Sequence, residues 1–153
     1  MKVREIMTKN PISVSPSSTM SDVVKTLAKN QISGVMVVNK GKLVGVVTQT
    51  DVIRAVDMYN KVNKSADVMS LVSAILESKD QKIKAGIRKM MKKKVRDVAK
   101  GEVISVESEE ELYRAATLLN LHEIDRLPVT QKGKLVGVIT KSDIIAALHR
   151  MDN

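Results

Sequence analysis

Hydrophobic and polar positions along the chain follow two periods, one typical of strands and one of helices. A short apolar run, Ile12–Val14, is followed by polar residues and then by apolar residues at helical spacing. Two β-rich runs, Val35–Val38 and Leu43–Val47, come next and are separated by four residues that include Gly41. Such runs predict strands, and a glycine between them predicts a hairpin turn with positive φ. The pattern therefore predicts a β-α-β-β-α unit whose last helix begins near Asp51.

The same pattern occurs a second time, 92 residues further along the chain. Residues 2–56 align without a gap on residues 94–148, and 20 of these 55 paired positions are identical, including the run Lys40–Val46. Background composition would give about three or four identities. Copy two therefore begins with a strand at Ile104–Val106 and ends with a helix near Asp143. The predicted fold class is α+β, a mixed α/β fold of two β-α-β-β-α repeats packed about a pseudo-twofold axis.

A connector separates the two copies. Its apolar residues recur at helical spacing, which predicts one or two additional helices with N-caps at Ser65 and Asp80, weakened near Gly86. The predicted domain boundaries are 1–60 for the first repeat, 61–93 for the helical connector and 94–153 for the second repeat.

Composition excludes several classes of protein. The chain of 153 residues has no Cys, so disulfides, thiolate zinc sites and cysteine nucleophiles are ruled out. Its longest apolar runs fall far short of the roughly 18 residues that a membrane span needs, and no signal-like apolar stretch follows Met1. We therefore expect a cytoplasmic protein without membrane contact. With 1% aromatic residues, folds that stack bases on several aromatic side chains are disfavoured.

The net charge of +9 is concentrated in one part of the chain. Residues 57–100 carry 12 basic and 5 acidic side chains, whereas residues 101–153 carry 6 basic and 9 acidic ones. A basic helix over Lys79–Arg96 predicts binding to a nucleic acid or an acidic partner, with phosphate attraction through Lys89, Lys92 and Lys93. The alternative interpretation is a solvated helix face.

Both copies carry the same motif where the last strand meets the last helix. It reads Gly45-Val46-Val47-Thr48-Gln49-Thr50-Asp51 and Gly137-Val138-Ile139-Thr140-Lys141-Ser142-Asp143. Unpaired backbone N–H groups at such a junction favour an anion, and a carboxylate suits the hydroxyls of a ribose. The alternative is that Asp51 and Asp143 only cap their helices. The motif alone is compatible with both interpretations.

The repeat, the hairpin and the junction together resemble a tandem pair of CBS domains, the Bateman module. The resemblance extends over both 55-residue copies and includes Val3-Arg4-Glu5-Ile6-Met7-Thr8 and Arg126-Leu127-Pro128-Val129. It implies a non-catalytic regulatory module that binds an adenosine derivative such as AMP, ADP, ATP or S-adenosylmethionine in clefts between the repeats, with no catalytic cofactor. It also implies a homodimer, and the regulated target stays unidentified.

The resemblance also implies which residues bind this ligand. Thr48 and Asp51, with Thr140 and Asp143, would contact ribose and phosphate, and Arg126 would reach the phosphates. Lys141 offers a further phosphate contact. The adenine would be held around the first strand and closed in by the middle strand of each repeat, at Ile12, Ser13, Val14, Ile104, Ser105, Val106, Val35, Met36, Leu127 and Pro128.

The two copies are not equivalent at these positions. Copy one has Gly34 where copy two has Arg126, and Met36 where copy two has Pro128. A charge-assisted contact contributes about 1.5–3 kcal/mol, so we expect two sites of unequal affinity. No catalytic motif is recognisable. The group His122-Glu123-Ile124-Asp125 has no second cluster beside it, so no metal site is predicted.

Overall fold

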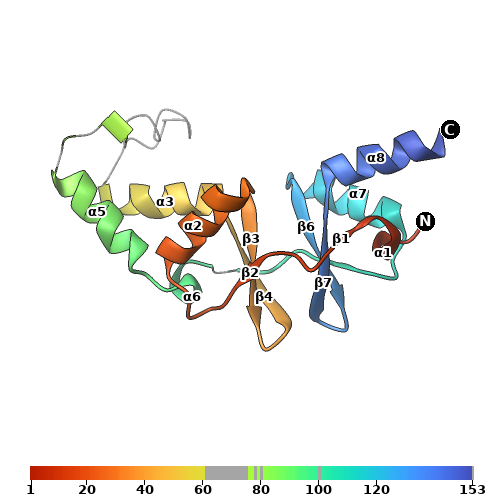
Figure 1. The fold of residues 1–153 in the computed structure, drawn as a ribbon, viewed down its shortest axis with the longest axis horizontal. Helices are drawn as coiled ribbons and strands as arrows, with labels where there is room; N and C mark the ends of the chain where they lie inside the picture. The colour runs from red at the N-terminus through yellow and green to blue at the C-terminus, as the bar shows by residue number, and fades with distance from the viewer. Residues whose placement is uncertain (61–75, 78, 80, 100, 153) are drawn as a thin grey trace. The chain divides into compact units, whose positions relative to one another are not determined.

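The computed structural model describes residues 1–60, 76–77, 79, 81–99 and 101–152, and each repeat forms the predicted β-α-β-β-α unit (Figure 1). The mixed α/β fold class is thereby confirmed. The chain divides into two compact units, one made of residues 1–13, 36–45 and 101–153, the other of residues 14–35 and 46–100.

In the first unit the strands of copy two form most of a small mixed sheet. Its strands β6 and β7 pair antiparallel around a turn at Gly133, whose φ of +80° is readily adopted by glycine. The short β5 pairs parallel to β6, and β1 from the start of the chain pairs antiparallel to β7. The bounds are β1 Thr8–Lys9, β5 Val106–Glu107, β6 Arg126–Gln131 and β7 Lys134–Thr140.

Helices α1 (Val3–Ile6), α7 (Leu112–Leu121) and α8 (Lys141–Met151) bury their apolar sides against this sheet. The core includes Val3 and Leu127, both fully buried. Because side chains alternate across a strand, Leu127 faces this core while its neighbours Arg126 and Pro128 project from the other side of β6.

The second unit has the corresponding copy-one elements and the connector. Strand β3 lies between β2 and β4, and helix α5 packs against α2 and α3. Both β3 and β4 extend across the division between the units, since their hairpin ends belong to the first unit. The bounds are β2 Ser13–Val14, α2 Met20–Asn30, β3 Gly34–Asn39, β4 Lys42–Thr48, α3 Gln49–Asn60, α5 Gln81–Met91 and α6 Val95–Val98.

Each repeat begins with a leading segment, residues 1–7 or 93–99, that packs on the polar turn of the other repeat. In the first unit the N–H of Val3 donates to the carbonyl of Glu110 at 2.9 Å. In the second unit the N–H of Val95 donates to the carbonyl of Ser18 at 2.8 Å. These two hydrogen bonds are related by the 92-residue offset at both ends. Duplication therefore preserved a contact that joins distant parts of the sequence.

Several sequence predictions need correction. Strands β2 and β5 do not include Ile12, Ile104 or Ser105. Helix α5 continues through Gly86, which is buried. The predicted caps at Ser65 and Asp80 lie outside the described residues.

The basic segment is not one helix over Lys79–Arg96. Helix α5 ends at Met91, a turn follows, and α6 begins at Val95, because the backbone of Lys93 accepts a hydrogen bond from Met20 instead of continuing the helix. Lys89 and Lys92 are exposed, whereas Lys93 is half-buried. Binding of a polyanion by these residues stays a prediction. Among the described helices, none has the length and apolar content of a membrane span.

Candidate functional site

The copy-two junction is built where β7 ends and α8 begins. The side chain of Thr140 caps α8 by accepting a hydrogen bond from the N–H of Asp143 at 3.3 Å. In return, one carboxylate oxygen of Asp143, Oδ2, accepts from the Thr140 N–H and hydroxyl, both at 2.8 Å. This reciprocal arrangement fixes both side chains at the start of the helix.

The copy-one junction has the same geometry. Oδ2 of Asp51 accepts hydrogen bonds from the Thr48 N–H at 2.8 Å and hydroxyl at 3.0 Å, and the Asp51 N–H donates to the Thr48 hydroxyl at 3.2 Å. Asp51 and Asp143 therefore both take part in capping their helices, and a ligand-binding role for them stays a prediction. In the described part of the chain Oδ1 of each carboxylate accepts no hydrogen bond. A capping role therefore leaves one oxygen of each carboxylate available to another donor.

Arg126 lies beside the copy-two junction. Its Cα is paired across the sheet with that of Thr140 in the register of β6 and β7. The side chain is half-buried, and its Nε is fully buried without a hydrogen-bond partner among the described residues. A buried unsatisfied donor costs about 1–3 kcal/mol. Such a donor next to a helix N-terminus is the arrangement expected if an acceptor from outside the chain occupies the site.

A second cation stands at the same edge. Lys141, the first residue of α8, forms an ion pair with Asp125 at 3.4 Å, and its N–H donates to the Asp125 carbonyl at 3.4 Å. Both side chains are more than half exposed, so this pair stabilises the fold little.

Copy one has no charge at the corresponding place. Gly34 is buried next to Thr48, and a Cβ there would lie 3.5 Å from the Val47 carbonyl oxygen and 3.6 Å from Cγ2 of Thr48. The Gln49 N–H donates to the Ser33 carbonyl at 2.9 Å, which matches the Lys141 contact of copy two. The backbone of the two junctions is alike, and their electrostatics differ.

The remaining predicted ligand residues have different environments. Val106 and Leu127 are buried in the core of the first unit, at 2% and 0% exposure, so their side chains stabilise the sheet. Ile12 is 42% exposed, and Ser13 is exposed as well. The others are buried or half-buried, namely Val14, Val35, Met36, Ile104, Ser105 and Pro128. Their role in binding a ligand stays a prediction.

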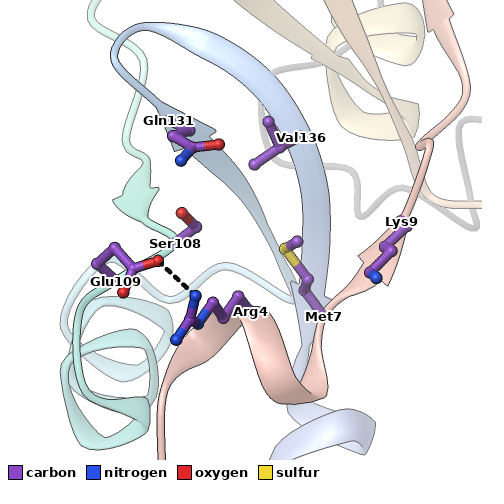
Figure 2. Close-up of a pocket in the computed structure, with 7 residues that line it drawn as sticks. All are labelled: Arg4, Met7, Lys9, Ser108, Glu109, Gln131 and Val136. Atoms are coloured by element: carbon purple, nitrogen blue, oxygen red, sulfur yellow. Dashed lines mark ion pairs between the residues drawn. The ribbon is translucent and has the colours of Figure 1, made fainter.

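A hollow of about 230 Å³ lies at the other end of the β6–β7 hairpin, away from Thr140 (Figure 2). Arg4, Met7 and Lys9 come to it from the start of the chain, Ser108 and Glu109 from the turn after β5, and Gln131 and Val136 from the hairpin. Sequence reasoning missed this site, because residues more than 100 positions apart form it. The available signal was that Lys9 and Glu109 have no charged counterpart in the other copy, where Gly101 and Ser17 stand.

Charged pairs hold the leading segment beside this hollow. Nη1 of Arg4 lies 3.1 Å from Oε1 of Glu109, and Nζ of Lys2 lies 2.6 Å from Oε1 of Glu111. The hydrogen bond from Lys2 holds the pKa of the Glu111 carboxyl below its usual range, and the same bond raises the pKa of Lys2. These groups stay charged near neutral pH. Within the described ranges, no three His, Asp or Glu side chains gather to hold a metal ion.

Comparison with known proteins gives a family for this geometry. The family model described as CBS domain matches residues 3–57 and 95–150. An uncharacterized protein of Methanocaldococcus jannaschii, MJ1426, is 34% identical over 154 residues, and the match covers 97% of this chain and 91% of that protein.

Solved structures have the same fold. The structure of CBSX2 in complex with AMP is 26% identical with a TM-score of 0.72, and the match covers 99% of this chain and 98% of that chain. The CBS domain pair of protein MJ0100, in complex with 5′-methylthioadenosine and S-adenosyl-L-methionine, is 21% identical with a TM-score of 0.66 and equal coverage. At that identity the second likeness concerns the fold alone.

Proposed function

The chain belongs to the CBS-domain family, and on this premise we propose that it is a non-catalytic regulatory module that binds an adenosine derivative at its strand-to-helix junctions. The observation that carries the proposal is the Arg126 side chain, whose buried Nε lacks a partner among the described residues next to Thr140. A phosphate or carboxylate oxygen of a ligand would satisfy this donor.

The junction supplies complementary groups for the rest of the ligand. Oδ1 of Asp143 is open to a ribose hydroxyl while Oδ2 keeps its capping bonds. The N-terminus of α8 favours negative charge, and Lys141 can exchange its exposed ion pair with Asp125 for a phosphate at little cost. A ribose with one or more phosphates matches this set of donors and acceptors.

The copy-one junction keeps Thr48 and Asp51 but has Gly34 in place of the arginine. We expect it to bind the same class of ligand more weakly. The finer choice among AMP, ADP, ATP and S-adenosylmethionine depends on the charge next to Arg126, and an anionic phosphate suits a guanidinium better than a sulfonium does.

Calorimetric titration of AMP, ATP and S-adenosylmethionine into the full chain tests this function. Arg126→Met keeps an unbranched aliphatic stem and removes the guanidinium with its charge and donors, so nucleotide affinity should fall about tenfold or more. Asp143→Asn keeps an acceptor for the capping bonds and removes the carboxylate, and it should also weaken binding. Arg114→Met is the matched control, because Arg114 is exposed on α7 far from the junction in sequence.

Absence of binding by all three ligands to the unmodified chain would refute the proposed function. Equal affinities for the Arg126→Met and Arg114→Met variants would refute the role of Arg126. Thermal unfolding of each variant verifies that the fold is retained.

We also propose that the chain associates as a homodimer through helices α7 and α8. Their outer faces expose Tyr113, Leu121, Ile145, Leu148 and Met151, each at least half exposed. The equivalent face of copy one is covered by α5 within the same chain. A second copy of this chain is a partner whose equivalent apolar face can bury this surface across a twofold axis.

A further inference from the structure

The hollow at the hairpin end of the first unit is separate from the proposed nucleotide junction. Strand β7 runs from Lys134, next to the hollow, to Thr140 at the junction, so the two places lie at opposite ends of one strand. Its volume of about 230 Å³ is below the roughly 300–1,000 Å³ of pockets that hold drug-sized ligands. A ligand for this hollow must be smaller than a nucleotide.

The polar groups of the hollow are incompletely paired. Ser108 is 3% exposed, its backbone is hydrogen-bonded, and its hydroxyl has no partner within the described part of the chain. In Figure 2 this hydroxyl points toward Gln131. The hydroxyl is not among the fully buried unpaired atoms of the described residues, so it is accessible from the hollow and can form a hydrogen bond with a ligand atom there.

Charges of both signs surround the hollow. Arg4 and Glu109 face each other across an ion pair, and their side chains are 56% and 57% exposed. An exposed pair of this kind contributes at most about 1 kcal/mol, so its partners can be exchanged at low cost. Lys9 is exposed and forms no ion pair among the described residues. The lining therefore offers two cations and one anion.

The lining also has an apolar side. Met7 and Val136 are half-buried and point toward the same space in Figure 2. The Met7 thioether lies against Gly137, where an added Cβ would lie 2.5 Å from its sulfur. A methionine side chain adapts readily to an aliphatic group of irregular shape.

From this combination we infer that the hollow binds a small aliphatic α-amino acid. Its carboxylate would pair with Arg4, its ammonium with Glu109, and its side chain would pack on Met7 and Val136. A carboxylic acid without the amino group would leave Glu109 unpaired, and an amine without the carboxylate would leave Arg4 unpaired. Because Arg4 and Met7 belong to the leading segment, the ligand would also stabilise its attachment to copy two.

The corresponding place in copy one lacks this chemistry. At the 92-residue offset Arg96 corresponds to Arg4, but Gly101 takes the place of Lys9, Pro16 that of Ser108, and Ser17 that of Glu109. We therefore expect each chain to bind one amino-acid ligand.

Calorimetry and thermal unfolding with L-leucine test the inference on the full chain. L-leucine should bind at one site and raise the unfolding temperature, whereas 4-methyl-2-oxopentanoate and isopentylamine, which each lack one charged group, should bind at least about tenfold more weakly. Glu109→Gln should reduce leucine affinity about tenfold and leave the affinity for the oxo acid unchanged. Glu110→Gln is the matched control, because the Glu110 side chain is exposed and does not line the hollow.

Absence of leucine binding would overturn the inference, and so would equal leucine affinities in the two glutamine variants. Equal binding of leucine and the oxo acid would overturn the amino-acid class. AMP titrated in parallel separates this result from the proposed function: loss of leucine binding with AMP binding retained contradicts only the amino-acid site.

Discussion

Helices α3 and α8 occupy equivalent positions in the two copies, yet their outer faces have different neighbours. Ile53 and Val56 of α3 are half-buried and buried, and α5 packs on that helix. Their counterparts on α8, Ile145 and Leu148, are 65% and 54% exposed. The connector supplies copy one with a cover from the same chain. Copy two keeps an apolar face that no described helix of the chain covers.

The leading segments, unlike the outer faces of α3 and α8, have the same backbone contacts in both copies. Only the side chains that reinforce the contacts differ. Arg4 and Lys2 form ion pairs with Glu109 and Glu111, whereas the copy-one turn has Ser17 and Thr19 at those positions. Duplication therefore retained the backbone packing of the leading segments, while the charged side chains around it diverged.

The largest expected change in the free energy of unfolding is at the two leading segments. Val3 and Val95 are each fully buried, and Val3→Ala and Val95→Ala should each lower the free energy of unfolding by about 2 kcal/mol. Urea unfolding measures the loss. The exposed Val44 serves as the control, and Val44→Ala should change stability by less than about 0.5 kcal/mol. A neutral result at either buried valine would show that the two segments are not equivalent.

Alanine substitutions at two glycines should change the free energy of unfolding by smaller amounts, and in opposite directions. A Cβ on Gly137 would lie 2.5 Å from the Met7 sulfur and 3.0 Å from the Thr8 carbonyl oxygen, so Gly137→Ala should destabilise the chain by about 1 kcal/mol. A Cβ on Gly34 would make ordinary contacts, and Gly34→Ala should stabilise it by about 0.4–1 kcal/mol.

In a Met7→Ala background, Gly137→Ala should lower the free energy of unfolding by less than it does in the unmodified chain, because the sulfur that the new Cβ would meet is gone. If the two glycine variants changed stability in the same direction, the close packing of the leading segment on β7 would be in doubt.

The smallest effect on stability, but a large one on assembly, is expected on the open face of α8. Leu148→Lys places a charge among exposed apolar residues, so it should convert a dimer to a monomer and leave the monomer's stability within about 0.5 kcal/mol. Light scattering of the eluting protein measures the mass. Val44→Lys, on an exposed strand residue, should remain dimeric. A monomeric unmodified chain, or a dimeric Leu148→Lys variant, contradicts the proposed dimer.

Much of the architecture was predictable from the sequence. Local periodicity and the glycine of each hairpin specify strands and helices, since these depend on neighbours within a few residues. The 92-residue repeat predicted the elements of copy two from those of copy one, and the charge difference between Gly34 and Arg126 follows directly from aligning the two copies. The one-helix interpretation of Lys79–Arg96 was wrong because Met20, distant in sequence, takes the hydrogen bond that a continuing helix would use.

The sequence by itself determined the repeated β-α-β-β-α unit and the paired Thr-x-x-Asp junctions. Only the tertiary structure revealed that each leading segment packs on the turn of the other repeat, that Arg126 has a buried donor unsatisfied by any described residue, and that seven residues from three segments line a hollow. The physical reason is that periodicity reports on local backbone geometry. Cavities and unsatisfied donors arise where segments distant in sequence meet, and neither is encoded in the spacing of residues along the chain.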